Sequence, residues 1–263
     1  MDRRGHQYMC LINFHFQDHP NYKLIVAANR DEFYERPTAQ AHFWEDKPYI
    51  LAGRDMVQFG TWLGVTKQGR FAALTNFRSA EQVSKDRVSR GEIVNNYLEG
   101  NMQPEAFLQS LQEKQDHYEG FNVLVGSPEA LFYFSNRQSN VTEIAEGTHG
   151  LSNHLLNTPW PKVVKGKQNL RDYVKNTEHI QVDVLFDILS DTEQAADSNL
   201  PETGIDVELE KELSSSFIKT PNYGTRSSSV LLVDRTDKLT FVERTYEAGV
   251  FSQEKHFTFQ LED

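Results

Sequence analysis

The chain of 263 residues has one cysteine, no long apolar run and fewer basic than acidic residues. A single cysteine excludes an internal disulfide framework and cysteine-rich zinc sites, and it suits a reducing compartment. No apolar stretch approaches the roughly 18 residues that cross a bilayer, and the start lacks the apolar segment of a secretory signal. The formal net charge of −11 argues against a phosphate grip on nucleic acid as the main role.

These absences predict a cytoplasmic protein that binds a small molecule, with no nucleic-acid partner and no membrane span. No metal and no cofactor is required by any motif: glycine-rich phosphate loops and zinc-type carboxylate–histidine spacings do not occur. The sequence alone does not predict an oligomeric state.

Strand patterns at both ends of the chain enclose helical patterns in the middle. Strands are expected at residues 10–16, 23–29, 49–55, 61–66, 70–77, 121–126, 130–136, 227–234, 238–246 and 254–262. Helices are expected at 89–100, 102–115, after Pro161 and at 182–191, and the acidic stretch 192–216 is expected to be a surface excursion. The fold class predicted is α+β, a sandwich of two mostly antiparallel sheets with helices outside, in one domain over residues 10–263.

The lone cysteine, Cys10, stands directly behind an internal methionine, Met9, at the head of the first expected strand. One interpretation is a small buried residue. The other is a hidden start at Met9, whose removal would leave Cys10 N-terminal, so that its own α-amine accepts the thiol proton. Residues 1–9 would then be an upstream extension or an expression remnant.

A polar cluster, Asn29-Arg30-Asp31-Glu32, follows the second expected strand. Such a cluster is often a solvated turn. A hairpin of the first two strands would, however, bring it beside Cys10, where a guanidinium lowers the pKa of a thiol and a carboxylate can hold an amine.

Other polar residues are weak signals alone. Asn76, Asn153 and Asn157 end or follow expected elements, and Arg226 precedes a late strand. Side-chain amides can donate to a developing oxyanion without titrating. Trp62, in "GTWLG", either packs within a strand or forms part of the wall of a substrate pocket. The basic segment 157–171 is either a solvated helix face or a contact for an anionic ligand.

Several long blocks resemble one known family: "MCLINF", "AANRDEF", "GRDMVQFGTWLGVTKQGRFAALTNFR", "GLSNHLLNTPWPKV" and "YGTRSSSVLLV". This is the NRDE (Asn-Arg-Asp-Glu) family, the transport and Golgi organisation protein family, and the match runs from Met9 to about Val233. That family is similar in turn to N-terminal-nucleophile hydrolases of the choloylglycine type, the bile-salt and penicillin amidases. The resemblance implies a four-layer αββα sandwich.

Carried over by position, the resemblance implies Cys10 as nucleophile, Asn76 and Asn153 as the two asparagines and Arg226 as the late arginine. The hydrolases place an arginine three residues before an aspartate, whereas this chain has its four residues contiguous. Aligning on Phe33 puts Glu32 on the aspartate and Asn29 on the arginine. Aligning on the arginine favours Arg30 and Asp31, with Glu32 as the alternative.

Three functions remain open at this level. The first is a cysteine amidohydrolase that cleaves a non-peptide C–N amide bond. The second, also implied by the resemblance, is a non-catalytic protein that binds or traffics haem or an acyl lipid, with Asn29, Trp62 and Asn157 as ligand contacts. The third is a structural protein in which the polar cluster fixes the fold. A Cys10 with a free amine separates the first from the others.

Overall fold

The computed structural model describes residues 10–78, 87–138 and 140–262, so the predicted extension at residues 1–9 lies outside the described residues. The strands are β1 Cys10–Phe16, β2 Tyr22–Phe33, β3 Thr38–Phe43, β4 Ile50–Asp55, β5 Leu63–Thr66, β6 Phe71–Asn76, β7 Phe121–Gly126, β8 Leu131–Ser135, β9 Thr142–Glu143, β10 Gly147–Leu151, β11 Tyr223–Asp234, β12 Lys238–Glu247 and β13 Val250–Gln260. The helices are α1 Gly91–Glu99, α2 Pro104–Glu113, α3 Pro161–Lys175, α4 Val182–Leu189 and α5 Val207–Glu212, with short 3₁₀ turns at Gln115–His117 and Asp197–Asn199.

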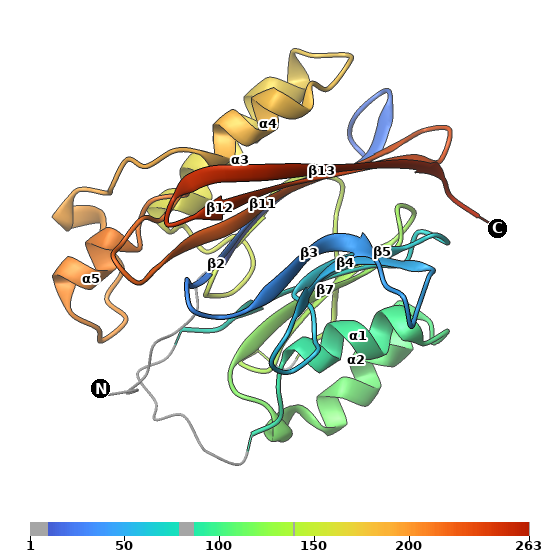
Figure 1. Ribbon diagram of the computed structural model, residues 1–263, viewed down its shortest axis with the longest axis horizontal. Coiled ribbons are helices and arrows are strands. Elements are labelled where there is room, and N and C mark those ends of the chain that lie inside the picture. Colours follow the sequence, from blue (N-terminus) through green and yellow to red (C-terminus); the bar gives the residue numbers. More distant parts are fainter. Residues whose placement is uncertain (1–9, 79–86, 139, 263) are drawn as a thin grey trace.

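Two antiparallel sheets stack face to face and helices cover both outer faces (Figure 1). Sheet A has the order β10-β1-β2-β11-β12-β13, and sheet B runs from β3 to β9 in sequence order. Helices α3 and α4 lie over sheet A, and α1 and α2 lie over sheet B. The predicted α+β sandwich, with the αββα layering that the resemblance implied, is confirmed.

Strand β1 shows how the sequence builds these layers. Its alternate residues Ile12 and Phe14 enter the apolar core between the two sheets. Leu11 belongs instead to the cluster that includes residues of α3, and Asn13 lies so close to Gly166 of that helix that a Cβ there would be 2.5 Å from the Asn13 Nδ2. Both faces of β1 are therefore buried, because side chains alternate between them.

The largest differences between observed and expected elements concern the strands β2, β3 and β10 and the segment 192–216. Strand β2 continues through the polar cluster to Phe33, because β11 pairs with it along its other edge, with Gly224 opposite Glu32. Strands β3 and β10 have no clear pattern in the sequence. The surface excursion predicted for 192–216 is wrong at α5, whose Glu210 is 4% exposed and forms an ion pair with the buried Arg78.

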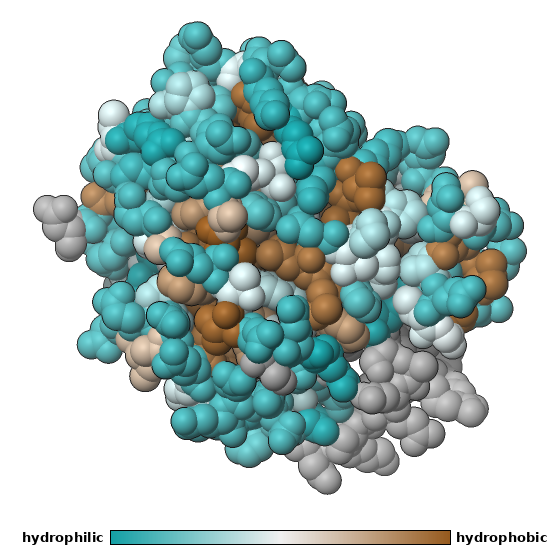
Figure 2. Space-filling view, turned by 180° about the vertical axis from the view of Figure 1, so that it is seen from behind, coloured by the Kyte–Doolittle hydropathy of each residue, from teal (hydrophilic) through white to brown (hydrophobic). Residues whose placement is uncertain are grey.

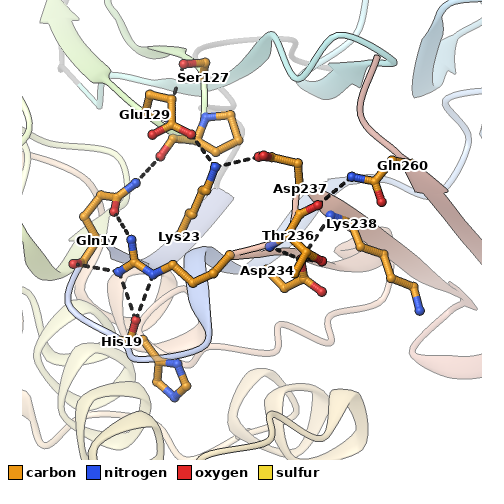
Figure 3. A network of polar contacts seen from close by, with 12 residues as sticks. Gln17, His19, Lys23, Ser127, Glu129, Asp234, Thr236, Asp237, Lys238 and Gln260 are labelled. Atoms are coloured by element: carbon orange, nitrogen blue, oxygen red, sulfur yellow. Dashed lines mark hydrogen bonds and ion pairs between the residues drawn. The ribbon is translucent and has the colours of Figure 1, made fainter. Parts of the chain in front are cut away.

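At the end of the sandwich away from Cys10, polar contacts join side chains of three turns and of the start of β2 (Figure 3). Lys23 Nζ lies 2.5 Å from Glu129 Oε1 and 2.6 Å from Asp237 Oδ1. Arg235 donates to the side chain and main chain of Gln17. These contacts tie the β1–β2 turn to the β7–β8 and β11–β12 turns.

The surface seen from behind is mostly hydrophilic, with apolar side chains in several small patches (Figure 2). Within the described ranges, no helix has the length and apolar character that a membrane crossing needs.

Candidate active site

A cavity of about 410 Å³ opens at the end of the sandwich where β1 begins. Its walls come from both sheets, from the segment ahead of α1 and from the ends of β11 and β12. Six of the predicted site residues line it: Cys10, Arg30, Asp31, Glu32, Asn76 and Arg226, and Trp62 forms part of the wall. Its volume falls in the range of about 300–1,000 Å³ that small-molecule sites occupy.

Cys10 is held in place by both neighbouring segments of sheet A. It pairs with Arg30 on β2, so the hairpin prediction that brought the polar cluster beside the thiol is confirmed. On the other side its carbonyl oxygen accepts a hydrogen bond from Ser152 Oγ at 2.9 Å. The cysteine is 7% exposed, and it forms part of the cavity lining.

The thiol of Cys10 is held in its protonated form. Burial raises its pKa to about 12, and the negative charge of Asp31 acts in the same direction. The backbone N–H of Asp31 and the guanidinium of Arg30 oppose that rise. Since the thiolate is the nucleophile, this site needs a proton acceptor close to the sulfur before it can react.

Arg30 and Glu32 face each other inside the cavity. Arg30 Nη2 lies 3.5 Å from Glu32 Oε2, and Arg30 Nη1 is buried with no hydrogen-bond partner in the part of the chain that the structure describes. Glu32 also accepts from the Phe33 N–H at 2.8 Å and lies 3.6 Å from Arg36 Nε. The Glu32 carboxylate is thus committed to its neighbours, whereas Arg30 keeps a donor available.

Asp31 is the carboxylate with a free oxygen. Its Oδ1 accepts from Thr225 Oγ1 at 2.6 Å, and its Oδ2 is buried without a hydrogen-bond partner among the described residues. Burial raises its pKa to about 6, and the positive charge of Lys162 opposes this. Of the two carboxylates that the sequence left open, Asp31 has the geometry to accept a hydrogen bond from an amine.

Asn76 and Asn153 meet where the two sheets join. Asn76 ends β6 and lines the cavity. Asn153 follows β10 and donates from Nδ2 to the Asn76 carbonyl at 2.9 Å, while its Oδ1 lies 3.0 Å from Ser152 Oγ. Asn153 therefore fixes the backbone of Asn76, which lines the cavity.

Arg226 acts as a clamp on the β2–β3 turn. Its Nη1 donates to the carbonyl oxygens of Phe33, Tyr34 and Arg36 at 2.8, 3.0 and 3.1 Å. The bulge in the β11–β2 register lies at this residue. Burial lowers the pKa of Arg226, and the nearby Arg30 adds to the effect.

Two residues predicted as ligand contacts lie outside the cavity lining. Asn29 Nδ2 donates to the carbonyls of Leu189 and Ser216 at 2.9 and 2.8 Å, toward the helix layer. Asn157 has a positive φ of 62° and its Oδ1 accepts from the Gly150 N–H at 3.1 Å in a tight turn. Both are placed where they hold the backbone.

Two buried ionisable residues escaped the sequence reasoning. Lys162, in the first turn of α3, is 3% exposed, and burial lowers its pKa to about 8. Glu243 on β12 lines the cavity, accepts from the Ala41 N–H at 2.7 Å, and has a pKa raised to about 7 by burial. No signal marks either residue, because charged residues in helix starts and alternating strands are usually solvated.

The described cavity lining brings together groups that can take part in acyl transfer. No cluster of three or more histidine, cysteine, aspartate or glutamate side chains suited to a metal ion occurs in residues 10–78, 87–138 and 140–262. What the site does assemble is a thiol, a guanidinium with a spare donor, a carboxylate with a spare acceptor, and an asparagine.

Two solved structures share this architecture. The chain is similar to the conjugated bile acid hydrolase from Clostridium perfringens in two crystallised variants. One has a TM-score of 0.53 at 11% identity and covers 97% of this chain and 93% of that one. The other has a TM-score of 0.51 at 12% identity and covers 96% and 97%. At this identity the likeness establishes a shared fold, that of N-terminal-nucleophile hydrolases.

Sequence comparison reaches nearer relatives. The chain is 35% identical over 257 residues to the mouse transport and Golgi organization 2 homolog. The alignment covers 90% of this chain and 93% of the mouse protein. The family model described as Transport and Golgi organisation 2 matches residues 9–248. The chain therefore belongs to the Transport and Golgi organisation 2 family.

Proposed function

We propose that the chain, once Cys10 is N-terminal, is a cysteine amidohydrolase that cleaves a non-peptide C–N amide bond. The observation that carries this proposal is the Cys10 thiol in the lining of the cavity, together with the spare donor of Arg30 and the spare acceptor of Asp31. The shared fold with bile acid hydrolases supports it. The family match that begins at Met9 agrees with Cys10 as the residue after an initiator methionine.

The residues divide the reaction between them. The α-amine of Cys10, held by Asp31, takes the thiol proton, and the thiolate attacks the amide carbon. Arg30 and the Asn76 amide stabilise the charge on the oxygen. The α-ammonium returns its proton to the leaving amine as the C–N bond breaks, and water then hydrolyses the thioester to release a carboxylic acid and the free thiol.

The charge balance of the cavity suggests the substrate class. Its described lining holds six arginines and six carboxylate residues. Since these charges offset one another, a neutral or weakly charged acyl amide fits better than a polyanion. Apolar residues of the cavity wall, such as Trp62 and Leu74, would contact the acyl group of the substrate.

The test compares three proteins on a panel of N-acyl p-nitroanilides of different acyl length. The first begins at Cys10, prepared by expression from Met9 and checked by intact mass. The second is the 263-residue chain, whose Cys10 amine is in a peptide bond. The third is the Cys10-first chain with Cys10→Ala. Turnover by the first protein alone supports the proposal, and equal rates in all three would refute it.

The protonated thiol favours a second candidate for the chain with an internal Cys10. A thiol with a pKa of about 12 and no free α-amine is a poor nucleophile. In that form we propose ligand binding without catalysis, with an acyl lipid or haem as the ligand. No histidine lines the cavity in the described residues, which favours the acyl lipid. Calorimetry of the 263-residue chain with a fatty acyl ligand and with haem distinguishes the two.

A further inference from the structure

Burying the ammonium group of Lys162 is energetically unfavourable for the fold. It follows Pro161 in the first turn of α3 and is 3% exposed, and its Nζ has no hydrogen-bond partner among the residues that the structure describes. Removing an ammonium from water without a partner is strongly unfavourable. A methionine at this position would avoid the cost, so the charge calls for a functional explanation.

The charge of Lys162 is directed at Asp31. Among the charged neighbours of Asp31, Lys162 has the largest effect on its pKa, and Asp31 likewise has the largest effect on Lys162. Both keep an unpartnered polar atom, Lys162 Nζ and Asp31 Oδ2, within the described part of the chain. The two groups are thus within electrostatic reach of each other, with no hydrogen bond between them among the described residues.

The other charged side chains around Lys162 and Asp31 already form pairs of opposite charge. On the side of Lys162, Arg78 forms a buried ion pair with Glu210. On the side of Asp31, Arg30 faces Glu32. Among the described charged groups that act on either residue, Lys162 and Asp31 are left, and each is the strongest charged neighbour of the other.

Cys10 lies close to both Asp31 and Lys162. Its thiol is among the groups that act on the pKa of Lys162. The next residue, Leu11, packs in one cluster with Trp160 and Val163, which flank Lys162 on α3. The Tyr34 hydroxyl is a further neighbour of Asp31. The chain start of a Cys10-first protein would therefore enter the region of Asp31 and Lys162.

We propose that the Lys162 ammonium neutralises Asp31, so that the α-amine of a Cys10-first chain stays an uncharged proton acceptor. This inference rests on the proposed function. A buried carboxylate alone would hold the amine as an ammonium, because an opposite charge favours the charged form. A lysine that already balances the carboxylate removes that effect. Lys162 is a positioning residue, since it acts on the amine through Asp31.

The titration of the two groups agrees with this role. Burial lowers the pKa of Lys162 to about 8, with Asp31 opposing the shift. Burial raises the pKa of Asp31 to about 6, with Lys162 opposing that shift. In each case the charge of the partner favours the ionised form, as expected of two buried groups of opposite charge.

The test uses the fact that the chain has one cysteine. Cysteine labelled with ¹³C and ¹⁵N gives a single set of NMR signals, and the Cys10 α-amine of the Cys10-first chain can be titrated directly. With Lys162→Met we expect the midpoint of the amine to rise by about one pH unit or more. Lys162→Arg keeps the charge and should keep the midpoint. Lys165→Met, which removes an exposed cation from the same helix, is the matched control.

Thermal unfolding of each variant shows that it is folded before it is titrated. An unchanged midpoint in folded Lys162→Met, or the same rise in Lys165→Met, overturns the inference. The measurement needs no substrate. A shift in the midpoint together with no amide turnover would refute the proposed function and leave the role of Lys162 standing, and turnover without a shift would do the reverse.

Discussion

Folding makes the Cys10 thiol of the 263-residue chain slow to alkylate. The structure raises its pKa from 9.0 to about 12. Three pKa units correspond to about a thousandfold less thiolate at any pH well below both values. Since iodoacetamide reacts with the thiolate, we expect the folded chain to be alkylated about a thousandfold more slowly at pH 8 than the unfolded chain.

Unfolding events do not mask this effect. A domain with a free energy of unfolding of about 5–15 kcal/mol is globally unfolded for less than about one part in a thousand of the time. Replacing Asp31 by asparagine removes the charge that, after burial, contributes most to the raised pKa of Cys10. Alkylation of Asp31→Asn should accordingly be about tenfold faster than that of the unchanged chain.

Intact mass measures the reaction without ambiguity, because a single cysteine gives a single alkylated product. The reference is the same chain in guanidinium chloride at the same pH. A folded chain that reacts within tenfold of the unfolded reference would show that Cys10 is not protonated and buried as described. A variant Asp31→Asn that reacts more slowly would show that the charge of Asp31 does not act on the thiol.

Three further predictions concern stability. Glu210→Gln leaves Arg78 buried without its carboxylate and should cost about 3–5 kcal/mol in a denaturant titration; a loss below about 1 kcal/mol would contradict the ion pair. Gly166→Ala puts a Cβ 2.5 Å from a side-chain nitrogen of β1 and should cost about 1–3 kcal/mol, whereas exposed Val164→Ala should change little. Burial raises the pKa of Glu243 to about 7. The protonated side chain therefore stabilises the folded chain at low pH, and this contribution is lost as the pH rises through 7. The free energy of unfolding of Glu243→Gln, relative to that of the parent, should be about 3 kcal/mol higher at pH 8 than at pH 4.

The sequence was most informative where the chain folds locally. Alternation in 10–16 and the turn after it predict the hairpin that sets Cys10 opposite Arg30. The extension of β2 to Phe33 depends on β11, which is almost 200 residues away in the chain. No local pattern can report such a partner, so the polar cluster resembles a strand end although it lies inside a strand.

Burial of charge was the main feature that the sequence did not reveal. Lys162 stands in a basic segment and Glu210 in an acidic one, and both segments have the composition of solvated surface. Each is buried because a partner of opposite charge, Asp31 or Arg78, arrives from another layer of the sandwich. The choice between Asp31 and Glu32 likewise needed the structure, since it depends on which oxygen remains unpartnered.

The most direct test of the central claim is the mass of the protein during reaction with an N-acyl p-nitroanilide. The Cys10-first chain is quenched in acid within a turnover and its intact mass is measured, followed by peptide mapping. The account predicts one added acyl group, on Cys10, that disappears as the substrate is consumed and is absent from the 263-residue chain. An acyl group on another residue, or p-nitroaniline release with no adduct dependent on Cys10, would contradict the account.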